Sequence, residues 1–223
     1  MPRIPRAHVG GVVLHAINRG NGRAEVFHKA DDYRAFLELI GQACERTPMR
    51  VLGYCLMPNH FHLVLWPGPA GEVSRWMQWL MTSHVRRYHR HYHGSGHVWQ
   101  GRFKSFPVQR QPEHLWTVLR YVEANPVRAG LVRRAEDWPW SSLRAWNEPE
   151  RPAWLAAGPA PRPRGWTARV NASLSDGQLE RVHRSVTRGQ PFGSDRWTAR
   201  IADRLGLEST LRPRGRPRKD PKK

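Results

Sequence analysis

The sequence predicts an α+β fold, in which an antiparallel sheet carries helices on one face. Segments with the composition of strands are interleaved with long segments whose apolar residues recur at helical spacing. Two of the strand segments follow each other directly and are joined by a turn at Pro58-Asn59, as in an antiparallel hairpin. At 223 residues, the chain is long enough to bury a sizeable core.

The elements follow in the order strand, helix, strand, strand, helix, strand, which resembles a ferredoxin-like unit. We predict a strand at 11–17, a helix at 31–45, strands at 50–56 and 60–66, a helix at 72–92, an extended segment at 98–109 and a helix at 112–124. The Gly- and Asn-rich segment 18–22 ends the first strand. Asn125-Pro126 stops the helix predicted at 112–124, because proline disfavours helical geometry in the residue before it.

The rest of the chain has a different composition. We divide the sequence into a main domain (1–148), a Pro-rich linker (149–165), a helical C-terminal extension (166–207) and a basic tail (208–223). Five prolines and two glycines argue against packed structure in the linker. In the extension, a capping box starts a helix at Ser175, and a last helix at 195–205 ends at Gly206.

The charge of the chain indicates a polyanionic partner. Lys and Arg number 37 against 18 Asp and Glu, so the net charge is +19. Such a charge destabilises a compact state by self-repulsion unless a polyanion neutralises it. Nucleic acid is the expected partner, bound with steep salt dependence.

Other features indicate where the protein works. Cys44 and Cys55 are the only cysteines and form neither a disulfide framework nor a zinc cluster, as expected in a reducing cytoplasm. No segment is long and apolar enough to span a bilayer, and the basic N-terminus leads into no signal-peptide core. We therefore expect a cytoplasmic, nucleoid-associated protein without a membrane partner.

Two histidines on one predicted strand form half of a candidate metal site. Side chains at i and i+2 of a strand share a face, so His60 and His62 project side by side. We expect Phe61, Val64 and Trp66 on the opposite, buried face. Neutral imidazole is the commonest protein metal ligand. The alternative is two polar residues on the wet face of a half-buried strand.

A tyrosine and an amide share one face of the helix predicted at 112–124. Tyr121 and Asn125 are four residues apart, and Asn125 lies at the helix end, where its amide oxygen can turn towards a cation. The alternative is a core tyrosine followed by an ordinary helix stop. Tyr88 and Tyr92 also lie on a helix beside histidines, so the spacing alone does not select one tyrosine.

Several motifs together resemble one family. They are Met57-Pro58-Asn59-His60-Phe61-His62, Trp99-Gln100-Gly101-Arg102-Phe103, the segment from Tyr121 to Leu131, and Trp138-Pro139-Trp140-Ser141-Ser142. In this order they are similar to the signature segments of the REP-associated tyrosine transposases, a branch of the single-tyrosine HUH insertion-sequence transposases. The resemblance covers about residues 8–146, so it identifies the main domain as the catalytic domain.

The resemblance implies a metal-dependent transposase that nicks and rejoins single-stranded, hairpin-forming DNA through a covalent 5′-phosphotyrosine. Tyr121 would be the nucleophile, and His60, His62 and Asn125 would hold Mg or Mn, of which Mn suits imidazole better. Many insertion-sequence relatives carry Gln where this chain has Asn125. Two alternatives remain: a non-catalytic DNA-binding protein derived from a transposase, and a metal-dependent nuclease that uses water. Both a monomer and a homodimer fit the sequence.

Aromatic and basic residues are candidates for contacts with DNA. Around residues 99–108 they alternate as in a channel for single-stranded DNA, or as in an amphipathic strand with a charged outer face. Residues 212–219 resemble an AT-hook, whose arginines enter a narrow minor groove, although a nonspecific basic tail has the same composition. The predicted DNA-binding residues are Trp99, Arg102, Phe103, Lys104, Arg128, Arg214, Arg216 and Arg218.

Overall fold

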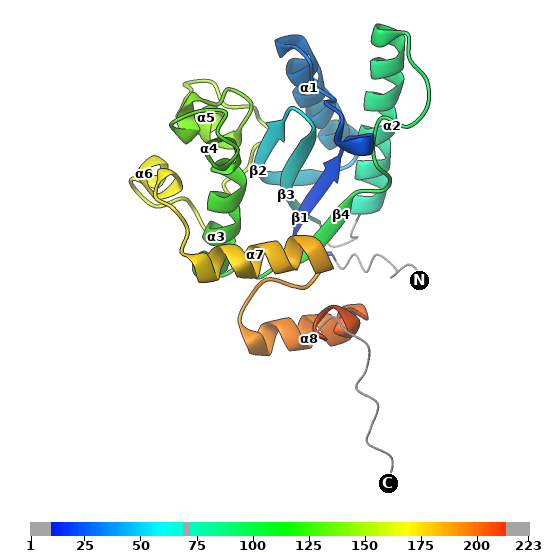
Figure 1. Ribbon diagram of the computed structural model, residues 1–223. Helices are drawn as coiled ribbons and strands as arrows, with labels where there is room; N and C mark the ends of the chain where they lie inside the picture. Colours follow the sequence, from blue (N-terminus) through cyan, green and yellow to red (C-terminus); the bar gives the residue numbers. More distant parts are fainter. Residues whose placement is uncertain (1–9, 69–71, 213–223) are drawn as a thin grey trace.

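A four-stranded antiparallel sheet forms the centre of the molecule (Figure 1). The computed structural model describes residues 10–68 and 72–212, and within these ranges the strand order is β2-β3-β1-β4. The strands are β1 (Val13–Arg19), β2 (Met49–Met57), β3 (His60–Pro67) and β4 (Lys104–Val108). This order is the ferredoxin-like arrangement, which confirms the predicted fold class.

Helices cover both faces of the sheet (Figure 1). The two helices of the ferredoxin-like unit, α1 (Ala30–Arg46) and α2 (Val73–Tyr92), lie on one face. On the opposite face lies α3 (Pro112–Glu123), which packs mainly against β2, so the prediction of helices on one face only is wrong for α3. The fold therefore has three layers, and the sheet is buried from both sides.

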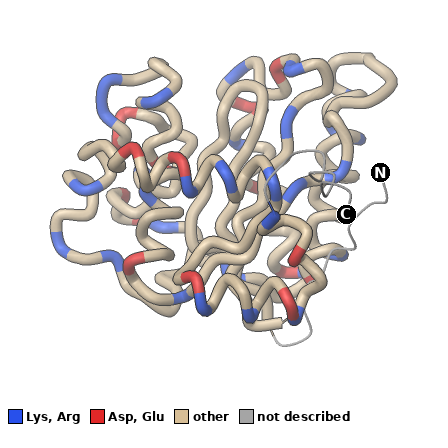
Figure 2. Tube along the Cα trace, turned by 60° about the horizontal axis from the view of Figure 1, so that its bottom comes forward, with Lys and Arg blue, Asp and Glu red and all other residues tan. Residues whose placement is uncertain are grey.

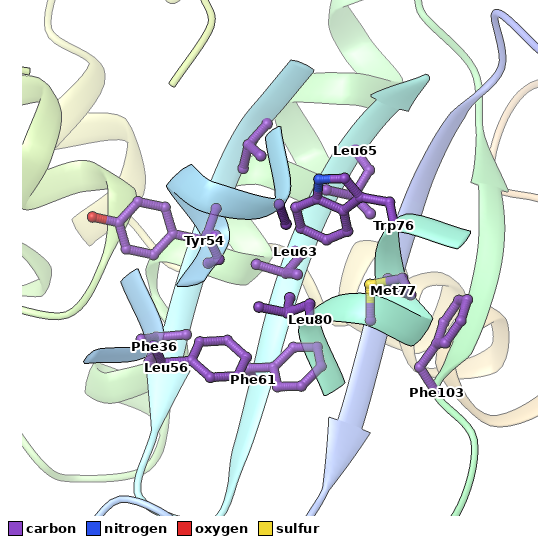
Figure 3. Close-up of a cluster of buried hydrophobic side chains, with 14 of the residues drawn as sticks. Phe36, Tyr54, Leu56, Phe61, Leu63, Leu65, Trp76, Met77, Leu80 and Phe103 are labelled. Carbon is purple, nitrogen blue, oxygen red and sulfur yellow. The ribbon is translucent and has the colours of Figure 1, made fainter. Parts of the chain in front are cut away.

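Apolar side chains fill the space between the sheet and the two helices α1 and α2 (Figure 3). Phe61 and Leu63 of β3 are fully buried against Phe36 of α1 and against Trp76 and Leu80 of α2. Burial of each such side chain contributes about 1.5–3 kcal/mol. This face therefore anchors β3 mainly through contacts between apolar side chains.

The alternation along β3 corrects one prediction. Val64 belongs to the core on the α3 side and Trp66 packs against that core, so both share a face with His62. The prediction that they point the same way as Phe61 is wrong. The side-chain period of a strand is two, so every even-numbered residue of β3 lies on one face.

Further helices follow α3. They are α4 (Asn125–Arg128), α5 (Ser142–Asn147), α6 (Trp166–Asn171), α7 (Asp176–Arg188) and α8 (Asp195–Leu205), with 3-10 turns at η2 (Ala135–Asp137) and η3 (Glu208–Thr210). A further 3-10 turn, η1 (Asn21–Arg23), lies between β1 and α1. The predicted capping box is present: Ser175 accepts from the backbone of Gln178, whose side chain accepts from the backbone of Ser175. Gly206 ends α8 with a φ of 64°, also as predicted. No helix in the described ranges is long and apolar enough to cross a bilayer.

The Pro-rich segment 149–165 is packed, contrary to prediction. The backbone N–H of Ala156 donates to the carbonyl of Val51 at 2.8 Å, and Leu155 is buried. Arg162 donates to the carboxylate of Glu123 at 2.6 Å. The prediction fails because β2 is an edge strand. Its free backbone groups, and the nearby buried carboxylate of Glu123, are hydrogen-bond partners for the proline-rich segment.

Candidate active site

Three histidines project from the two central strands toward α3. His60 and His62 of β3 lie side by side, with ring centroids 5.0 Å apart, as the strand period predicts. His15 of β1 lies next to them, with its Nε2 at 2.9 Å from Nδ1 of His62. His15 and His62 are buried, whereas His60 is half-buried at the edge of the group.

Tyr121 of α3 faces this histidine group. Its ring lies 5.8 Å from the ring of His62, edge to face, and is 6% exposed. The guanidinium of Arg128 in α4 lies 4.2 Å from the centre of the Tyr121 ring. A single chain therefore brings the tyrosine and the two histidines of the HUH-like motif together.

The hydrogen bond that each histidine makes through one ring nitrogen shows which of its nitrogens is left available. Nδ1–H of His60 donates to Oδ1 of Asn59 at 2.6 Å, so Nε2 of His60 keeps its lone pair. Nδ1 of His62 is occupied by His15, so Nε2 is also the free nitrogen of His62. Among the described residues, neither Nε2 has a hydrogen-bond partner, which suits them to bind a metal ion.

The site is a poor environment for positive charge on a histidine. Burial lowers the pKa of His15 to about 3 and that of His60 to about 4, the latter helped by the nearby charge of Arg19. Burial, together with the neighbouring histidines, lowers the pKa of His62 well below its usual value. All three rings are neutral at pH 7, so each keeps a lone pair on one of its two ring nitrogens.

Tyr121 experiences two opposing effects. Burial raises the pKa of its phenol, while the charge and hydrogen bond of Arg128 and the charge of Arg19 lower it. Burial is the larger effect, so the hydroxyl is protonated at neutral pH. A reaction through this oxygen therefore requires that its proton be removed.

His60 and His62 are two candidate ligands that lie side by side, and the structure describes no contact between them and the third candidate, Asn125. In the part of the chain that the structure describes, no three His, Cys, Asp or Glu side chains are grouped closely enough to enclose a metal. The two histidines could be joined by Oδ1 of Asn125, whose Nδ2 is buried without a hydrogen-bond partner among the described residues. Two imidazoles and an amide would leave positions for phosphate oxygens, as catalytic metal sites require.

The end of α3 is fixed by a buried carboxylate two residues after Tyr121. Glu123 is 0% exposed and accepts hydrogen bonds at 2.6 Å from the hydroxyl of Ser142, the guanidinium of Arg162 and the indole N–H of Trp166. Gly53 of β2 allows this close packing, because a Cβ there would lie 2.6 Å from Leu119 of α3. The helix then breaks at Ala124, and Asn125-Pro126 begins α4 rather than ending all helical structure.

The predicted DNA-binding residues fall into three groups. Trp99 and Phe103 are 5% and 6% exposed and belong to the core beside α2, so the prediction that they stack on bases is wrong. Arg102 and Lys104 are exposed, and of these residues only Lys104 belongs to a strand, β4. Arg128 lies in the site itself. Arg214, Arg216 and Arg218 lie outside the described residues.

Two histidines near Tyr121 were missed by sequence reasoning. His15 stands in an apolar strand, on the face opposite to Leu14 and Ala16, and this alternation could have drawn attention to it. His183 of α7 reaches Tyr121 with a ring separation of 5.7 Å. Nothing in the sequence around His183 marks it, because only the folding of α7 onto α3 brings it there.

Basic residues are spread over the molecule. Figure 2 shows Lys and Arg on most elements of the described chain, with fewer Asp and Glu between them. Arg19 and Arg128 are the ones whose charges act on the histidines and Tyr121. This distribution suits a large polyanion better than a small acidic ligand.

A tyrosine helix facing paired histidines on a ferredoxin-like sheet defines a class of single-tyrosine transposases, and the family comparison agrees. The family described as "Transposase IS200 like" matches residues 8–125, more than half of the chain. The chain therefore belongs to this transposase family.

Within that class, the similar proteins are REP-associated tyrosine transposases, which confirms the resemblance found in the sequence. One from Escherichia coli (strain K12) is 25% identical over 137 residues, covering 60% of this chain and 77% of the relative. A solved structure described as a REP-associated tyrosine transposase bound to a REP hairpin matches with a TM-score of 0.54 and 21% identity. It covers 70% of this chain and 92% of the matched chain, and supports the fold.

Proposed function

We propose that this protein is a metal-dependent DNA strand transferase that nicks and rejoins single-stranded, hairpin-forming DNA through Tyr121. The observation that carries the proposal is the position of Tyr121, whose ring lies 5.8 Å from that of His62 within one chain. Family membership supports DNA transposition, and the relative bound to a REP hairpin supports a folded single strand as the substrate.

Tyr121 is proposed as the nucleophile. Its oxygen forms a bond to phosphorus while the bond from phosphorus to the 3′ oxygen breaks. The products are a 5′-phosphotyrosine and a DNA end that takes up a proton as a free 3′-hydroxyl. Because the phosphodiester energy is kept in the covalent intermediate, attack by another 3′-hydroxyl can rejoin a strand.

The surrounding residues support this role. Arg128 lies over the Tyr121 ring, and its charge favours the phenolate that burial disfavours. His60, His62 and Asn125 would hold the cation, which we propose to be Mn or Mg. A cation bound there would polarise the scissile phosphate and offset the negative charge that develops in the transition state.

The partner is proposed to be DNA alone. The net charge of +19 supports binding with steep salt dependence. Exposed Arg102 and Lys104 are proposed to contact the phosphate backbone, and the tail arginines 214, 216 and 218 a minor groove. Since both halves of the site come from one chain, a monomer is proposed to be sufficient for cleavage.

The proposal is tested with hairpin DNA labelled at either end, drawn from palindromes that flank the gene. The protein is incubated with Mn or Mg, and the products are separated on a denaturing gel. We expect a covalent band on the 5′ end of the downstream fragment, absent in Tyr121→Phe. Tyr88→Phe is the matched control, because Tyr88 bonds His28 on another part of the surface.

Each other outcome selects an alternative. Cleavage that persists in Tyr121→Phe would indicate a nuclease that uses water. Tight, salt-sensitive binding without cleavage of any hairpin would indicate a non-catalytic DNA-binding protein. An adduct that is lost in Tyr88→Phe but kept in Tyr121→Phe would show that the wrong tyrosine had been chosen.

A further inference from the structure

His15 is the one member of the histidine group that the proposed reaction leaves without a role. It stands on β1, opposite Val64 of β3 and Phe106 of β4, and is 0% exposed. Its ring packs at 4.7 Å from that of Phe106 and 6.5 Å from that of Tyr121. A polar ring buried this deeply costs stability unless its nitrogens find partners.

Among the described residues, only one nitrogen of His15 has a hydrogen-bond partner. Nε2 lies 2.9 Å from Nδ1 of His62. Nδ1 is buried and, among the described residues, has no hydrogen-bond partner. An apolar residue here would avoid this cost, so the contact with His62 is the feature that distinguishes histidine from its apolar neighbours.

The contact between the two rings can be made in two ways. Either Nε2–H of His15 donates to Nδ1 of His62, or Nδ1–H of His62 donates to Nε2 of His15. In the first arrangement, Nε2 of neutral His62 carries the proton and has no lone pair to give. In the second, the lone pair of His62 Nε2 is free, on the nitrogen next to the candidate cation site.

We propose that His15 is a positioning residue that accepts the Nδ1–H of His62 and so presents Nε2 of His62 to a divalent cation. This rests on the metal site proposed above. Metal-bound histidines commonly donate their other N–H to an acceptor, which fixes both the tautomer and the ring orientation. For His60 the acceptor is Asn59, and for His62 it is His15.

The arrangement couples two rings through one proton. When His62 binds a cation through Nε2, its Nδ1 must carry the proton, so Nε2 of His15 must be the acceptor. The proton of His15 must then reside on Nδ1, the nitrogen that has no partner. Loading of the site therefore selects a single tautomer for each of the two rings.

The first test measures Mn binding without DNA, by titration calorimetry or by the loss of the free Mn signal in electron paramagnetic resonance. His15→Phe keeps an aromatic ring of similar size but removes the acceptor, and we expect 10–100-fold weaker binding, about the range for loss of such partners. His15→Gln keeps an acceptor near the position of Nε2, and we expect binding within a few-fold of the natural protein. Thermal unfolding in metal-free buffer checks that both variants fold.

The second test needs no variant. Nitrogen-15 NMR of histidine-labelled protein loaded with Mg reports the tautomer of each ring, and we expect Nδ1–H in both His15 and His62. A merely structural role for His15 would not require this pair of tautomers. His15 observed with its proton on Nε2 in the loaded protein would overturn the proposal.

A third variant separates the two proposals. If His62→Ala binds Mn as tightly as the natural protein, the metal site itself is wrong. If His62→Ala loses binding while folded His15→Phe keeps it, the site stands and the role of His15 is rejected. Loss in His15→Phe with rescue in His15→Gln supports both.

Discussion

The two faces of the sheet differ in the kind of side chain that they bury. Toward α1 and α2, the sheet presents apolar side chains that interlock with others, such as Phe61 against Phe36. Toward α3, it presents polar groups within an apolar surround, among them His15 and His62, and meets the carboxylate of Glu123. The first face is stabilised mainly by the burial of apolar surface, whereas each polar group on the second face needs a specific hydrogen-bond partner.

This difference places rigidity and chemistry on opposite sides of the same strands. β3 is fixed from behind by apolar packing, so the side chains on its other face project from a rigid backbone. Removing a group from the first face should therefore change stability, and removing one from the second face should change stability and chemistry together.

One of the two largest expected effects on stability comes from the face toward α1 and α2. Trp76→Ala removes a fully buried indole, and we expect a loss of about 3–5 kcal/mol in the free energy of unfolding, measured with urea. The yield of the DNA adduct per folded molecule should stay unchanged. The matched control is Trp79→Ala on the same helix, where the indole is only half-buried and the loss should be less than half as large.

On the face toward α3, Glu123→Ala should destabilise by a comparable amount, about 3–5 kcal/mol, because it leaves the guanidinium of Arg162 buried without its carboxylate. Here the adduct yield should also fall, since Glu123 fixes the end of the helix that carries Tyr121. The double variant Glu123→Leu with Arg162→Met should be more stable than the single variant. A single variant that costs under about 1 kcal/mol would remove this distinction between the faces.

A polar exception on the first face gives the third prediction. Burial lowers the pKa of His84 from 6.5 to about 4, helped by Arg87 and opposed by Asp32. Because the unfolded chain takes up this proton first, the folded state loses stability as the pH falls from 6.5 through 4, by about 3 kcal/mol. The loss is measured by urea denaturation at several pH values.

His84→Phe is the comparison for that measurement, because it lacks the titrating group. The other buried histidines contribute to both proteins, so the difference between the two pH profiles isolates His84. Identical profiles between pH 7 and 4 would show that the first face tolerates a charged imidazole.

The smallest expected effect lies in the extension that packs on α3. Ser175→Ala removes the hydroxyl that caps α7, and we expect a loss of about 1 kcal/mol. Amide hydrogen exchange should be faster in the first turn of α7. Ser173→Ala, an exposed serine two residues earlier, should stay within about 0.5 kcal/mol of the natural protein. Equal effects of the two substitutions would contradict the role of the cap.

The fold was predictable because its signals are local. Helical spacing gave α1 and α2 to within one residue at each end, and β2 and β3 were found to a similar precision. The hairpin and the order of elements then limited the sheet to few arrangements. The packing of 149–165 was not predictable, because composition shows that a segment forms no regular structure but not that it binds an edge strand.

The candidate site was predictable only in part. His60 and His62 share a face by strand period alone, and their approach to Tyr121 followed from the family resemblance. The contact between His15 and His62 depends on the register between β1 and β3, which no local pattern contains. Trp99 and Phe103 were misassigned because alternating aromatic and basic residues occur both in a binding groove and in a segment whose aromatic side chains join the core.

The bonds of Glu123 also define how short a working version of this protein can be. The family match ends at residue 125, yet Glu123 draws its hydrogen bonds from Ser142, Arg162 and Trp166. A fragment cut at the end of the matched region would contain the tyrosine and both histidines but would lack all three of these partners of the Glu123 carboxylate. The minimal unit that keeps this carboxylate bonded extends through Trp166, so the reacting residues and the residues that hold them in place have different boundaries along the chain.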